Sequence, residues 1–479
     1  MEFRGRAADL GLLAGQLRAV EAGSGTTRGR AVVMTGRRRV GKSRLAQEFC
    51  DRSGRPHLVF QATRGRSPGA ERAAFGKSLT ASALPGLPED AESRPADWNA
   101  ALTLLAAAAP DDVPSIAVLD EIPWLMEQDK EFEGALQTVW DRHLSRKPIL
   151  LILIGSDHGL MESLQSYERP FFGRAAKMNV RPLHLADVRE LTGLPSAEAV
   201  DALLITGGLP EVVESWDSGM SRRDFLSEAL SHPLTPLLAS GELSLLGEFP
   251  EPSRSRAILR AVGTGERTFT AIATEAGGDG PLPAGTLAPL LASLQEKQVL
   301  ESDLPLSTKA DTKNKRYRIG DTYLRFWLRF LEGAIPFVER GRSDIPIGRI
   351  ERSWTTWRGR AVEPLIRSSL LTLLPDSGWE ETGAVGGWWN RQNNPEIDLV
   401  GADAGPVAKR VDFLGSVKWL ENETFGWKDL NRLAADARAV PGATGETPLV
   451  AVTLNGADPD LPLAAHWGPD DLVRAWRTA

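Results

Sequence analysis

The chain has 479 residues, with 56 lysines and arginines against 63 aspartates and glutamates, and a formal net charge of −7 at pH 7. At about 150 residues per domain, this length predicts roughly three domains with ample hydrophobic core. The acidic balance argues against a broadly basic nucleic-acid-binding surface, although one basic face can coexist with it. A single cysteine, Cys50, and six scattered histidines exclude a disulfide framework and a cysteine-based zinc site.

Apolar runs in this chain are short. The longest purely apolar one, Ile149–Ile154, is far too short to cross a bilayer, and the first residues lack an apolar signal region. Together with the cysteine content, this predicts a soluble protein of the reducing cytoplasm without a membrane partner.

A phosphate-binding loop follows the apolar run Ala31–Met34, where residues 36–43 match G-x-x-x-x-G-K-[ST]. Glycines allow the backbone to wrap phosphates, and the helix expected from Lys42 to Cys50 adds its positive dipole end. Lys42 is expected to reach the β- and γ-phosphates and Ser43 to hold Mg²⁺. The alternative is a glycine turn beside a helix. The predicted nucleotide-binding residues here are Gly36, Arg37, Arg38, Arg39, Val40, Gly41, Lys42, Ser43 and Arg44.

Two further apolar strands end in polar residues that suit the same site. Ser115–Glu121 ends in two acids, of which Asp120 is expected to order Mg²⁺ through water and Glu121 to polarise the attacking water. Ile149–Ile154 leads into Ser156, a predicted γ-phosphate sensor. The alternatives are solvated acids at a strand end and a plain strand-to-loop turn.

In their order, these motifs resemble the archaeal-type P-loop ATPases of the AAA+/STAND division, whose chains open with a Phe-x-Gly-Arg-x-x-x-Leu box. Residues 3–10 have this pattern, and the resemblance covers about the first half of the chain. It extends over Phe3–Leu10, Gly36–Ser43, Asp120–Glu121, Gly155–Ser156, Phe172–Arg174 and Gly207–Pro210.

The resemblance implies two further roles. Pro210 would lie against the nucleotide base from a helical lid, and Arg174 would act on the γ-phosphate, in cis or across a subunit boundary of a homo-oligomer. Taken without the resemblance, Gly207–Pro210 is also typical of an ordinary loop between helices. Arg174 is equally compatible with a surface position.

Beyond the lid, apolar positions recur at helical spacing in 257–262, 269–273 and 287–294, and two strands follow. This order resembles a winged helix-turn-helix. The third helix carries no Lys or Arg from Leu282 to Glu296, which favours packing or partner binding over DNA readout. One basic cluster offers phosphate contacts or a solvated wing, and it contains Lys309, Lys313, Lys315, Arg316 and Arg318.

The segment Tyr317–Trp327 looks like a signature that joins such ATPases to a C-terminal domain related to PD-(D/E)XK nucleases. That arrangement would place Glu363 on a helix and Asp398 and Lys418 on neighbouring strands, as a possible second site for Mg²⁺. Ser416 stands where the nuclease pattern has glutamate, and a neutral serine is a weak metal ligand. Glu396 can replace it only with favourable backbone curvature. Cleavage therefore competes with a retained fold used for binding or structure.

The predicted fold is α/β: a P-loop AAA-like ATPase with a helical lid, a winged-helix unit and a C-terminal α/β nuclease-like domain. The predicted boundaries are 1–195 for the ATPase domain, 196–248 for the lid, 252–319 for the winged-helix-like domain and 320–479 for the nuclease-like domain, with Glu248–Pro252 as a linker.

The predicted function is ATP binding with slow, Mg²⁺-dependent hydrolysis, whose nucleotide state moves the lid and winged-helix unit relative to the C-terminal domain. One alternative is a nucleic-acid effector in which ATP gates metal-dependent cleavage by the last domain. Another is a scaffold that binds ATP without turnover. DNA, another protein and further copies of the chain are the partners left open.

Overall fold

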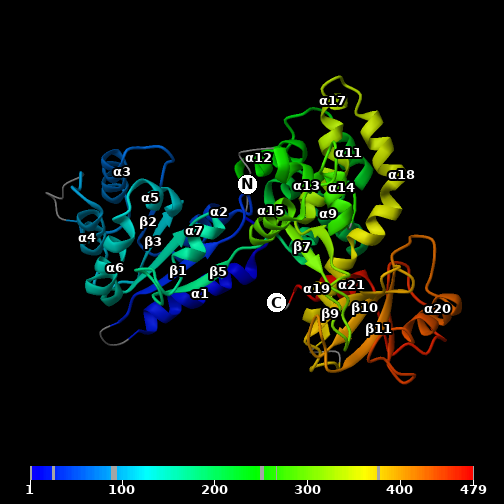
Figure 1. The fold of residues 1–479 in the computed structure, drawn as a ribbon. Helices are drawn as coiled ribbons and strands as arrows, with labels where there is room; N and C mark the ends of the chain where they lie inside the picture. The colour runs from blue at the N-terminus through cyan, green and yellow to red at the C-terminus, as the bar shows by residue number, and fades with distance from the viewer. Residues whose placement is uncertain are drawn as a thin grey trace. The chain divides into compact units, whose positions relative to one another are not determined.

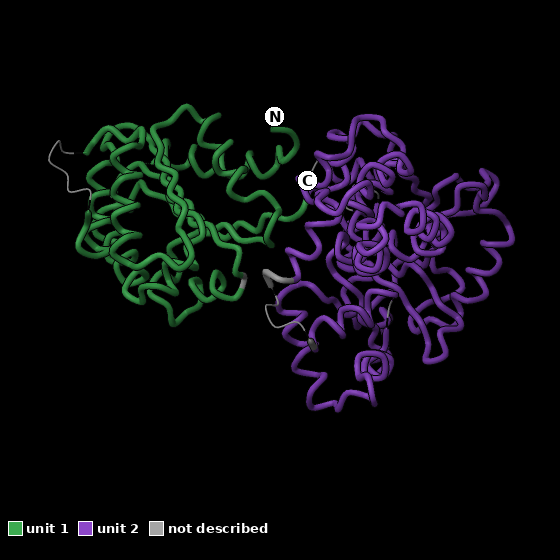
Figure 2. The backbone as a smooth tube through the Cα atoms, turned by 90° about the horizontal axis from the view of Figure 1, so that it is seen from above, with its two compact units in different colours: residues 1–182 green, residues 183–479 purple. Residues whose placement is uncertain are grey.

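The computed structural model describes residues 3–23, 27–87, 94–248, 253–265, 267–374 and 378–477. The chain forms two compact units, residues 1–182 and 183–479 (Figure 2). Both contain β-sheets covered by helices (Figure 1).

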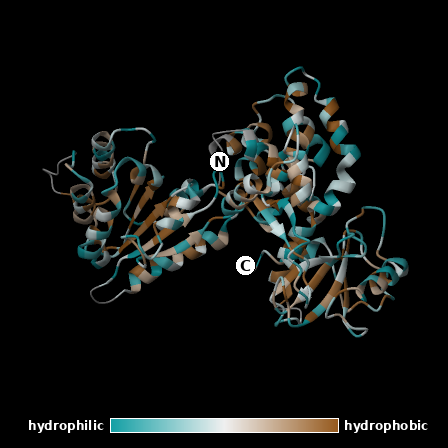
Figure 3. Cartoon of the chain, viewed as in Figure 1, coloured by the Kyte–Doolittle hydropathy of each residue, from teal (hydrophilic) through white to brown (hydrophobic). Residues whose placement is uncertain are grey.

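The first unit is built on a five-stranded parallel sheet in the order β2-β3-β4-β1-β5. Every residue of β3 and β4 is buried, because helices cover both faces of the sheet. Strands in that environment have continuous apolar sequences, which appear brown in Figure 3. The strands are β1 (Arg30–Thr35), β2 (His57–Gln61), β3 (Ser115–Asp120), β4 (Ile149–Ile154) and β5 (Ala175–Asn179).

Two hydrophobic cores lie on opposite faces of this sheet. Residues of alternate parity in each strand enter one core or the other, as the two-residue period of a strand requires. α1 (Ala7–Ala22) and α2 (Lys42–Ser53) contribute to one core. The helices on the other face are α3 (Pro68–Thr80), α4 (Trp98–Ala108), α5 (Ile122–Gln128), α6 (Phe132–Arg142) and α7 (His158–Ser163).

The second unit begins with a helical segment, followed by three helices and a small antiparallel sheet in the order β6-β8-β7. Of the predicted linker Glu248–Pro252, residues 249–252 lie outside the described residues. The first helices are α8 (Leu185–Thr192), α9 (Ser196–Thr206), α10 (Pro210–Glu214), α11 (Arg222–Ala229) and α12 (Pro236–Glu248). The next elements are α13 (Ser253–Gly263), β6 (Arg267–Thr268), α14 (Phe269–Glu275), α15 (Ala284–Glu296), β7 (Leu300–Asp303) and β8 (Arg316–Ile319).

The last part of the second unit surrounds a mixed five-stranded sheet in the order β13-β12-β11-β10-β9. β9, β10 and β11 pair antiparallel, whereas β11, β12 and β13 pair parallel. Its preceding helices are α16 (Thr322–Phe326), a π-helical turn (Trp327–Leu331), α17 (Ile335–Val338), α18 (Asp344–Ala361) and α19 (Glu363–Leu373). The remaining elements are β9 (Ala384–Trp389), β10 (Glu396–Ala402), β11 (Val411–Lys418), α20 (Trp427–Ala437), β12 (Leu449–Thr453), β13 (Ala465–Trp467) and α21 (Pro469–Arg474).

The predicted α/β class is confirmed. The first compact unit ends at residue 182, and the finer predicted boundaries at 195, 248 and 319 stay predictions. Within the described ranges, no helix is long and apolar enough to cross a membrane.

The aromatic segment around α16 fastens the start of the second unit to its middle. The hydroxyl of Tyr323 donates to the carbonyl of Leu237 at 2.6 Å, and the indole N–H of Trp327 donates to that of Leu238 at 3.2 Å. Both aromatic side chains are fully buried, so their polar atoms need such partners. A Cβ at Gly207, the C-cap of α9 at φ +60°, would lie 2.3 Å from the Cβ of Tyr323.

This contact predicts a large stability cost for Gly207→Ala. Gly341 provides a matched control, since its φ is +68° and a Cβ added there would have nothing within 4 Å. Both alanines incur the left-handed backbone cost of about 1–2 kcal/mol. Gly207→Ala must also displace α16, which adds about 1–3 kcal/mol. Urea unfolding followed by tryptophan fluorescence measures the difference, and equal losses in the two variants would contradict the packing described here.

Candidate nucleotide site and a second pocket

The predicted phosphate loop connects β1 to α2, as its motif requires. Gly36 has a φ of +146° and Gly41 a φ of +87°, values that favour glycine. A Cβ on Gly36 would lie 2.3 Å from the carbonyl oxygen of Val180, so no larger residue fits there. The loop ends at the N-terminus of α2, where backbone N–H groups and the helix dipole favour an anion.

Lys42 is the buried cation of this loop. Its side chain is 6% exposed, and its ammonium donates to the carbonyls of Gly36 at 2.7 Å and Arg37 at 2.9 Å. Burial lowers the pKa of Lys42 to about 8, against the opposing effect of the nearby acids Glu121 and Asp120. Lys42 therefore lies against the backbone of the phosphate loop, close to Asp120 and Glu121, the two acids predicted for this site.

The strand order brings the other predicted residues together. Because β4 lies between β3 and β1, the residues after these strands meet at one edge of the sheet. The Ser156 hydroxyl donates to the Glu121 carboxylate, 3.1 Å from each oxygen. Asp120 is buried and accepts a bond from the backbone N–H of Glu121 at 2.8 Å. Glu121 itself has a φ of +56°, a left-handed conformation that is uncommon outside glycine.

These donors suit Mg²⁺ bound with a nucleotide. Mg²⁺ prefers oxygen ligands, keeps several waters, and is commonly held by one or two protein groups together with phosphates. Ser43 is exposed at the start of α2, and Asp120 supplies a buried carboxylate at the end of β3, at the same edge of the sheet. The residues therefore fit this cofactor.

Arg6 is a residue whose role the sequence did not reveal, because the sequence marks it only as part of the Phe3–Leu10 box. Its guanidinium is 5% exposed and donates to the carbonyls of Val40, in the phosphate loop, and of Arg181, the latter at 2.8 Å. Its contact with Asp9 at 2.9 Å balances the buried charge. Arg6 of the Phe3–Leu10 box therefore stabilises the phosphate loop. Because this contact joins residues far apart in the chain, no local sequence pattern predicts it.

Arg174 lies at the other edge of the sheet. β5 runs parallel to β1 with Ala175 opposite Ala31, whereas the phosphate loop follows Thr35 at the far end of β1. The guanidinium donates to both carboxylate oxygens of Asp141, at 2.8 and 2.7 Å. Roughly 15–20 Å of strand separates the two edges, which does not favour action of Arg174 on the γ-phosphate in cis. Action in cis and action across a subunit boundary both stay predictions.

Pro210 is the first residue of α10 and belongs to the second compact unit. Gly208 just before it has a φ of +69°, and a Cβ there would lie 2.1 Å from the carbonyl oxygen of Leu183. The backbone of the predicted lid turn is therefore closely packed. Its contact with the nucleotide base stays a prediction.

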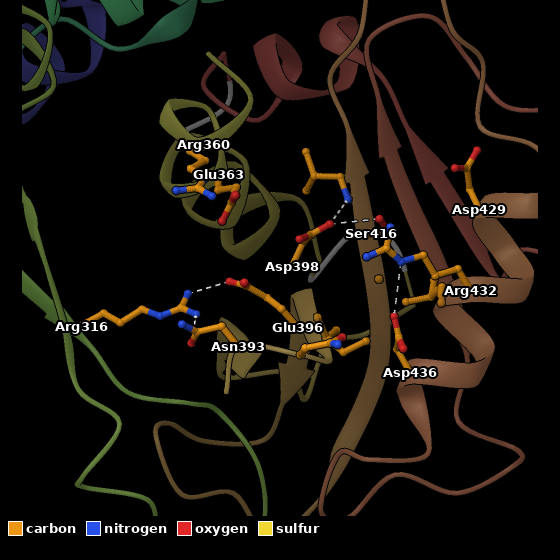
Figure 4. Close-up of a pocket in the computed structure, with 15 residues that line it drawn as sticks. Arg316, Arg360, Glu363, Asn393, Glu396, Asp398, Ser416, Asp429, Arg432 and Asp436 are labelled. Carbon is orange, nitrogen blue, oxygen red and sulfur yellow. Dashed lines mark hydrogen bonds and ion pairs between the residues drawn. The ribbon is translucent and has the colours of Figure 1, made fainter. Parts of the chain in front are cut away.

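A second pocket, of about 570 Å³, lies in the C-terminal part of the chain (Figure 4). Asp398 on β10 lines it and accepts bonds from the Ser416 hydroxyl at 3.0 Å and from the backbone N–H of Val417 at 2.8 Å. Burial raises the pKa of Asp398, although both hydrogen bonds oppose the shift. Glu363, also in the lining, binds Arg367 at 2.9 Å.

These residues do not fit a nuclease metal centre. The Lys418 ammonium contacts Asp429 at 2.8 Å and Glu423 at 3.1 Å, rather than Asp398. In the part of the chain that the structure describes, no group of three or more His, Cys, Asp or Glu side chains is arranged to hold a metal ion. Ser416 donates a hydrogen bond to Asp398, whereas the glutamate of the nuclease pattern would bind the metal ion.

The predicted basic cluster is partly neutralised within the chain. Arg316 contacts Glu396 at 2.6 Å, donates to Asn393 at 2.7 Å and stacks 4.1 Å from the ring of Trp389. Arg318 pairs with Asp303 at 2.8 Å. The predicted solvated wing is therefore wrong for these two arginines, because each is largely buried beside an acid, Glu396 from β10 for Arg316 and Asp303 from the adjacent strand β7 for Arg318.

Comparison with known families bears on the part of the chain that contains the first site. Residues 15–215 match the family described as an ATPase domain predominantly from Archaea. Residues 327–429 match a family described as archaeal and bacterial proteins of unknown function. The archaeal ATPase resemblance is confirmed, whereas the nuclease relationship stays a prediction.

Individual relatives cover most of the chain. An uncharacterised protein of Methanocaldococcus jannaschii is 26% identical over 398 residues, which are 81% of this chain and 82% of its own. The Walker-type ATPase of Pyrococcus abyssi has 21% identity and a TM-score of 0.49, covering 68% of this chain and 96% of its own. The Aeropyrum pernix ORC2 protein, solved with ADPNP and ADP, has 12% identity, a TM-score of 0.44, and coverages of 72% and 96%. Neither superposition is close enough to transfer residue roles.

The lowered pKa of Lys42 predicts that ATP binding takes up a proton at alkaline pH. Above about pH 8 the free lysine loses its charge, and the anionic phosphates restore it on binding. ATP affinity should therefore fall as pH rises past this value, by up to about tenfold per pH unit. Calorimetric titrations in buffers of different ionisation enthalpy count the protons.

Lys42→Arg is the matched control for this titration, because arginine stays protonated. Its affinity should be independent of pH over the same range, whatever its absolute value. Equal pH dependence in the wild type and the arginine variant would contradict the assignment to Lys42.

The donor set around Asp398 predicts that this pocket does not bind a divalent cation. Mn²⁺ titrations of nucleotide-free protein, followed by electron paramagnetic resonance, should be identical for the wild type and Asp398→Asn. Mn²⁺ binding that disappears in Asp398→Asn would show that the pocket is a metal site after all.

Proposed function

We propose that the protein is a Mg²⁺-dependent ATPase that acts as a nucleotide-driven switch. The observation that carries this proposal is the Glu121–Ser156 pair at the tips of two neighbouring strands, at the same sheet edge as the phosphate loop. A carboxylate there suits the orientation of a water for in-line attack, and a loop that only bound phosphate would not need it.

Each residue of this edge has a defined task in the proposed reaction. Backbone N–H groups of the loop and the Lys42 ammonium neutralise charge on the β- and γ-phosphates, after Lys42 exchanges its two carbonyl acceptors for phosphate oxygens. Glu121 orients the attacking water, and Ser156 holds that carboxylate through its hydroxyl. When bound, Mg²⁺ would be held by Ser43 and Asp120 and would supply positive charge against the phosphates.

The division of the chain supports the switch. Pro210 belongs to a different compact unit from the phosphate loop. If the first unit binds the nucleotide and Pro210 contacts its base, the presence or absence of the γ-phosphate would move one unit relative to the other. The winged-helix-like helices α13–α15 belong to the responding unit, and a protein or DNA partner there, or further copies of the chain, would receive the signal.

ATP-gated nucleic-acid cleavage has less support. Lys418 and Glu363 are engaged by other side chains, and Asp398 is satisfied by Ser416 and the backbone. The C-terminal domain therefore suits binding or structural roles better than metal-dependent hydrolysis.

Phosphate release from ATP tests the proposed reaction, with and without single- or double-stranded DNA. Lys42→Ala should lose ATP binding and turnover together. Glu121→Gln should bind ATP within a few-fold of wild type while turnover falls by about 100-fold or more. Ser156→Ala should show a smaller loss of turnover, because the carboxylate remains.

Glu127→Gln is the control for Glu121→Gln, since it makes the same change at an exposed position of α5, the helix that begins directly after Glu121. It should hydrolyse ATP at the wild-type rate. Full turnover in Glu121→Gln would remove Glu121 from the mechanism. ATP binding without any phosphate release by the wild type would favour a scaffold, and DNA-stimulated release would favour a nucleic-acid effector.

A further inference from the structure

A buried arginine links the predicted lid to the C-terminal domain. Arg358 on α18 is 2% exposed, and its guanidinium donates to both carboxylate oxygens of Asp201 on α9, at 3.1 and 3.4 Å. The same nitrogen donates to Glu421, in the loop after β11, at 2.9 Å. A buried charge is stable only when it has partners. Removal of either Arg358 or Asp201 would therefore leave an unpaired charge in the protein interior.

A second arginine extends the cluster to α11. Arg222 lies 3.8 Å from Asp201, contacts Glu351 on α18 at 3.0 Å, and stacks 4.3 Å from the ring of Trp354. Burial raises the pKa of Asp201 to about 6, whereas Arg358 and Arg222 both act to lower it. Asp201 is thus held between two cations from different helices, which restricts sliding of α9 and α11 against α18.

The same helix α9 leads directly into the lid turn. It ends at Thr206, and Gly207 after it packs against Tyr323 so closely that a side chain would not fit. Tyr323 and Trp327 donate in turn to carbonyls at the start of α12. The end of α9 and the start of α12, both within the lid segment, are therefore fixed to parts of the chain beyond residue 320.

Apolar packing continues across the same boundary. One hydrophobic core runs through the second unit and includes Val200 of α9, Phe225 of α11, Trp354 of α18 and Trp419 at the end of β11. Close-packed interiors are bistable or rigid rather than continuously deformable. Neither the ion pairs nor the core leaves a surface along which the lid can move by itself.

We propose that the buried Asp201–Arg358–Glu421 cluster is a latch that makes the lid helices α9–α12 and the C-terminal domain move as one body when nucleotide binds. This proposal rests on the proposed function, because nucleotide binding is what causes the movement. It differs from the movement expected from the sequence, in which the lid moves relative to the C-terminal domain. The pocket around Asp398 would then move together with the lid helices, without an intervening hinge.

Spin-label distances can test the latch in the full-length chain. The one native cysteine, Cys50, is buried, so labels attach only at introduced cysteines. Leu12, Glu228 and Lys428 are exposed on α1, α11 and α20, and serve as sites for Leu12→Cys, Glu228→Cys and Lys428→Cys. Double electron–electron resonance is recorded with and without a non-hydrolysable ATP analogue and Mg²⁺.

The latch predicts that the Glu228→Cys/Lys428→Cys distance is unchanged by the analogue in an otherwise wild-type chain. With Arg358→Met, this distance distribution should broaden or shift with nucleotide. Arg352→Met makes the same change at an exposed position of α18 and should behave as wild type. A nucleotide-dependent distance without any further substitution, or an Arg358→Met distribution identical to that of Arg352→Met, would overturn the latch.

Two features keep the outcomes separable. The Leu12→Cys/Glu228→Cys distance tests the proposed switch. If nucleotide leaves this distance unchanged, the proposed switch is contradicted. The latch is still tested in that case by the width of the Glu228→Cys/Lys428→Cys distance distribution in Arg358→Met. If Arg358→Met does not fold, Glu421→Gln removes the exposed arm of the cluster, since Glu421 is 59% exposed. A wild-type Glu228→Cys/Lys428→Cys distribution in Glu421→Gln would then overturn the role of the cluster.

Discussion

The order of the strands in the first sheet is the constraint on which the nucleotide site depends. Since β4 lies between β3 and β1, the residues following three buried parallel strands meet at a single edge. Burial of these strands on both faces fixes their ends, and so fixes the phosphate loop, the Asp120–Glu121 pair and Ser156 relative to one another. A site assembled in this way is held by the core of the unit rather than by flexible loops.

Local patterns predicted residues that the structure brings to one edge of this sheet. A motif such as Gly36–Ser43 encodes its own backbone geometry, and apolar runs such as Ile149–Ile154 show where buried strands end. What the sequence could not show was which edge of the sheet each loop occupies, and hence that Arg174 lies away from Lys42. The bracing contact of Arg6 with Val40 was hidden for the same reason, because it joins residues far apart in the chain.

In the second unit, too, the sequence could not show which charged residues far apart in the chain lie next to one another. The basic cluster around Arg316 predicted a solvated or phosphate-binding wing, yet Glu396 and Asn393 lie against that arginine. Conversely, the departure at Ser416 was visible in the sequence, and the structure gives it a physical meaning as a donor to Asp398. Ion pairs between distant residues thus decide which arginines remain available to partners and which hold the fold together.

Hydrogen–deuterium exchange with and without ATP and Mg²⁺ tests the central claim, that one edge of the first sheet is the nucleotide site, most directly. Nucleotide should slow exchange in peptides covering residues 36–44, 120–121 and 155–156. In the monomer, exchange around residues 170–174 should not change, because Arg174 lies at the opposite edge. Unchanged exchange in the phosphate loop, or protection confined to the Arg174 edge, would contradict the account.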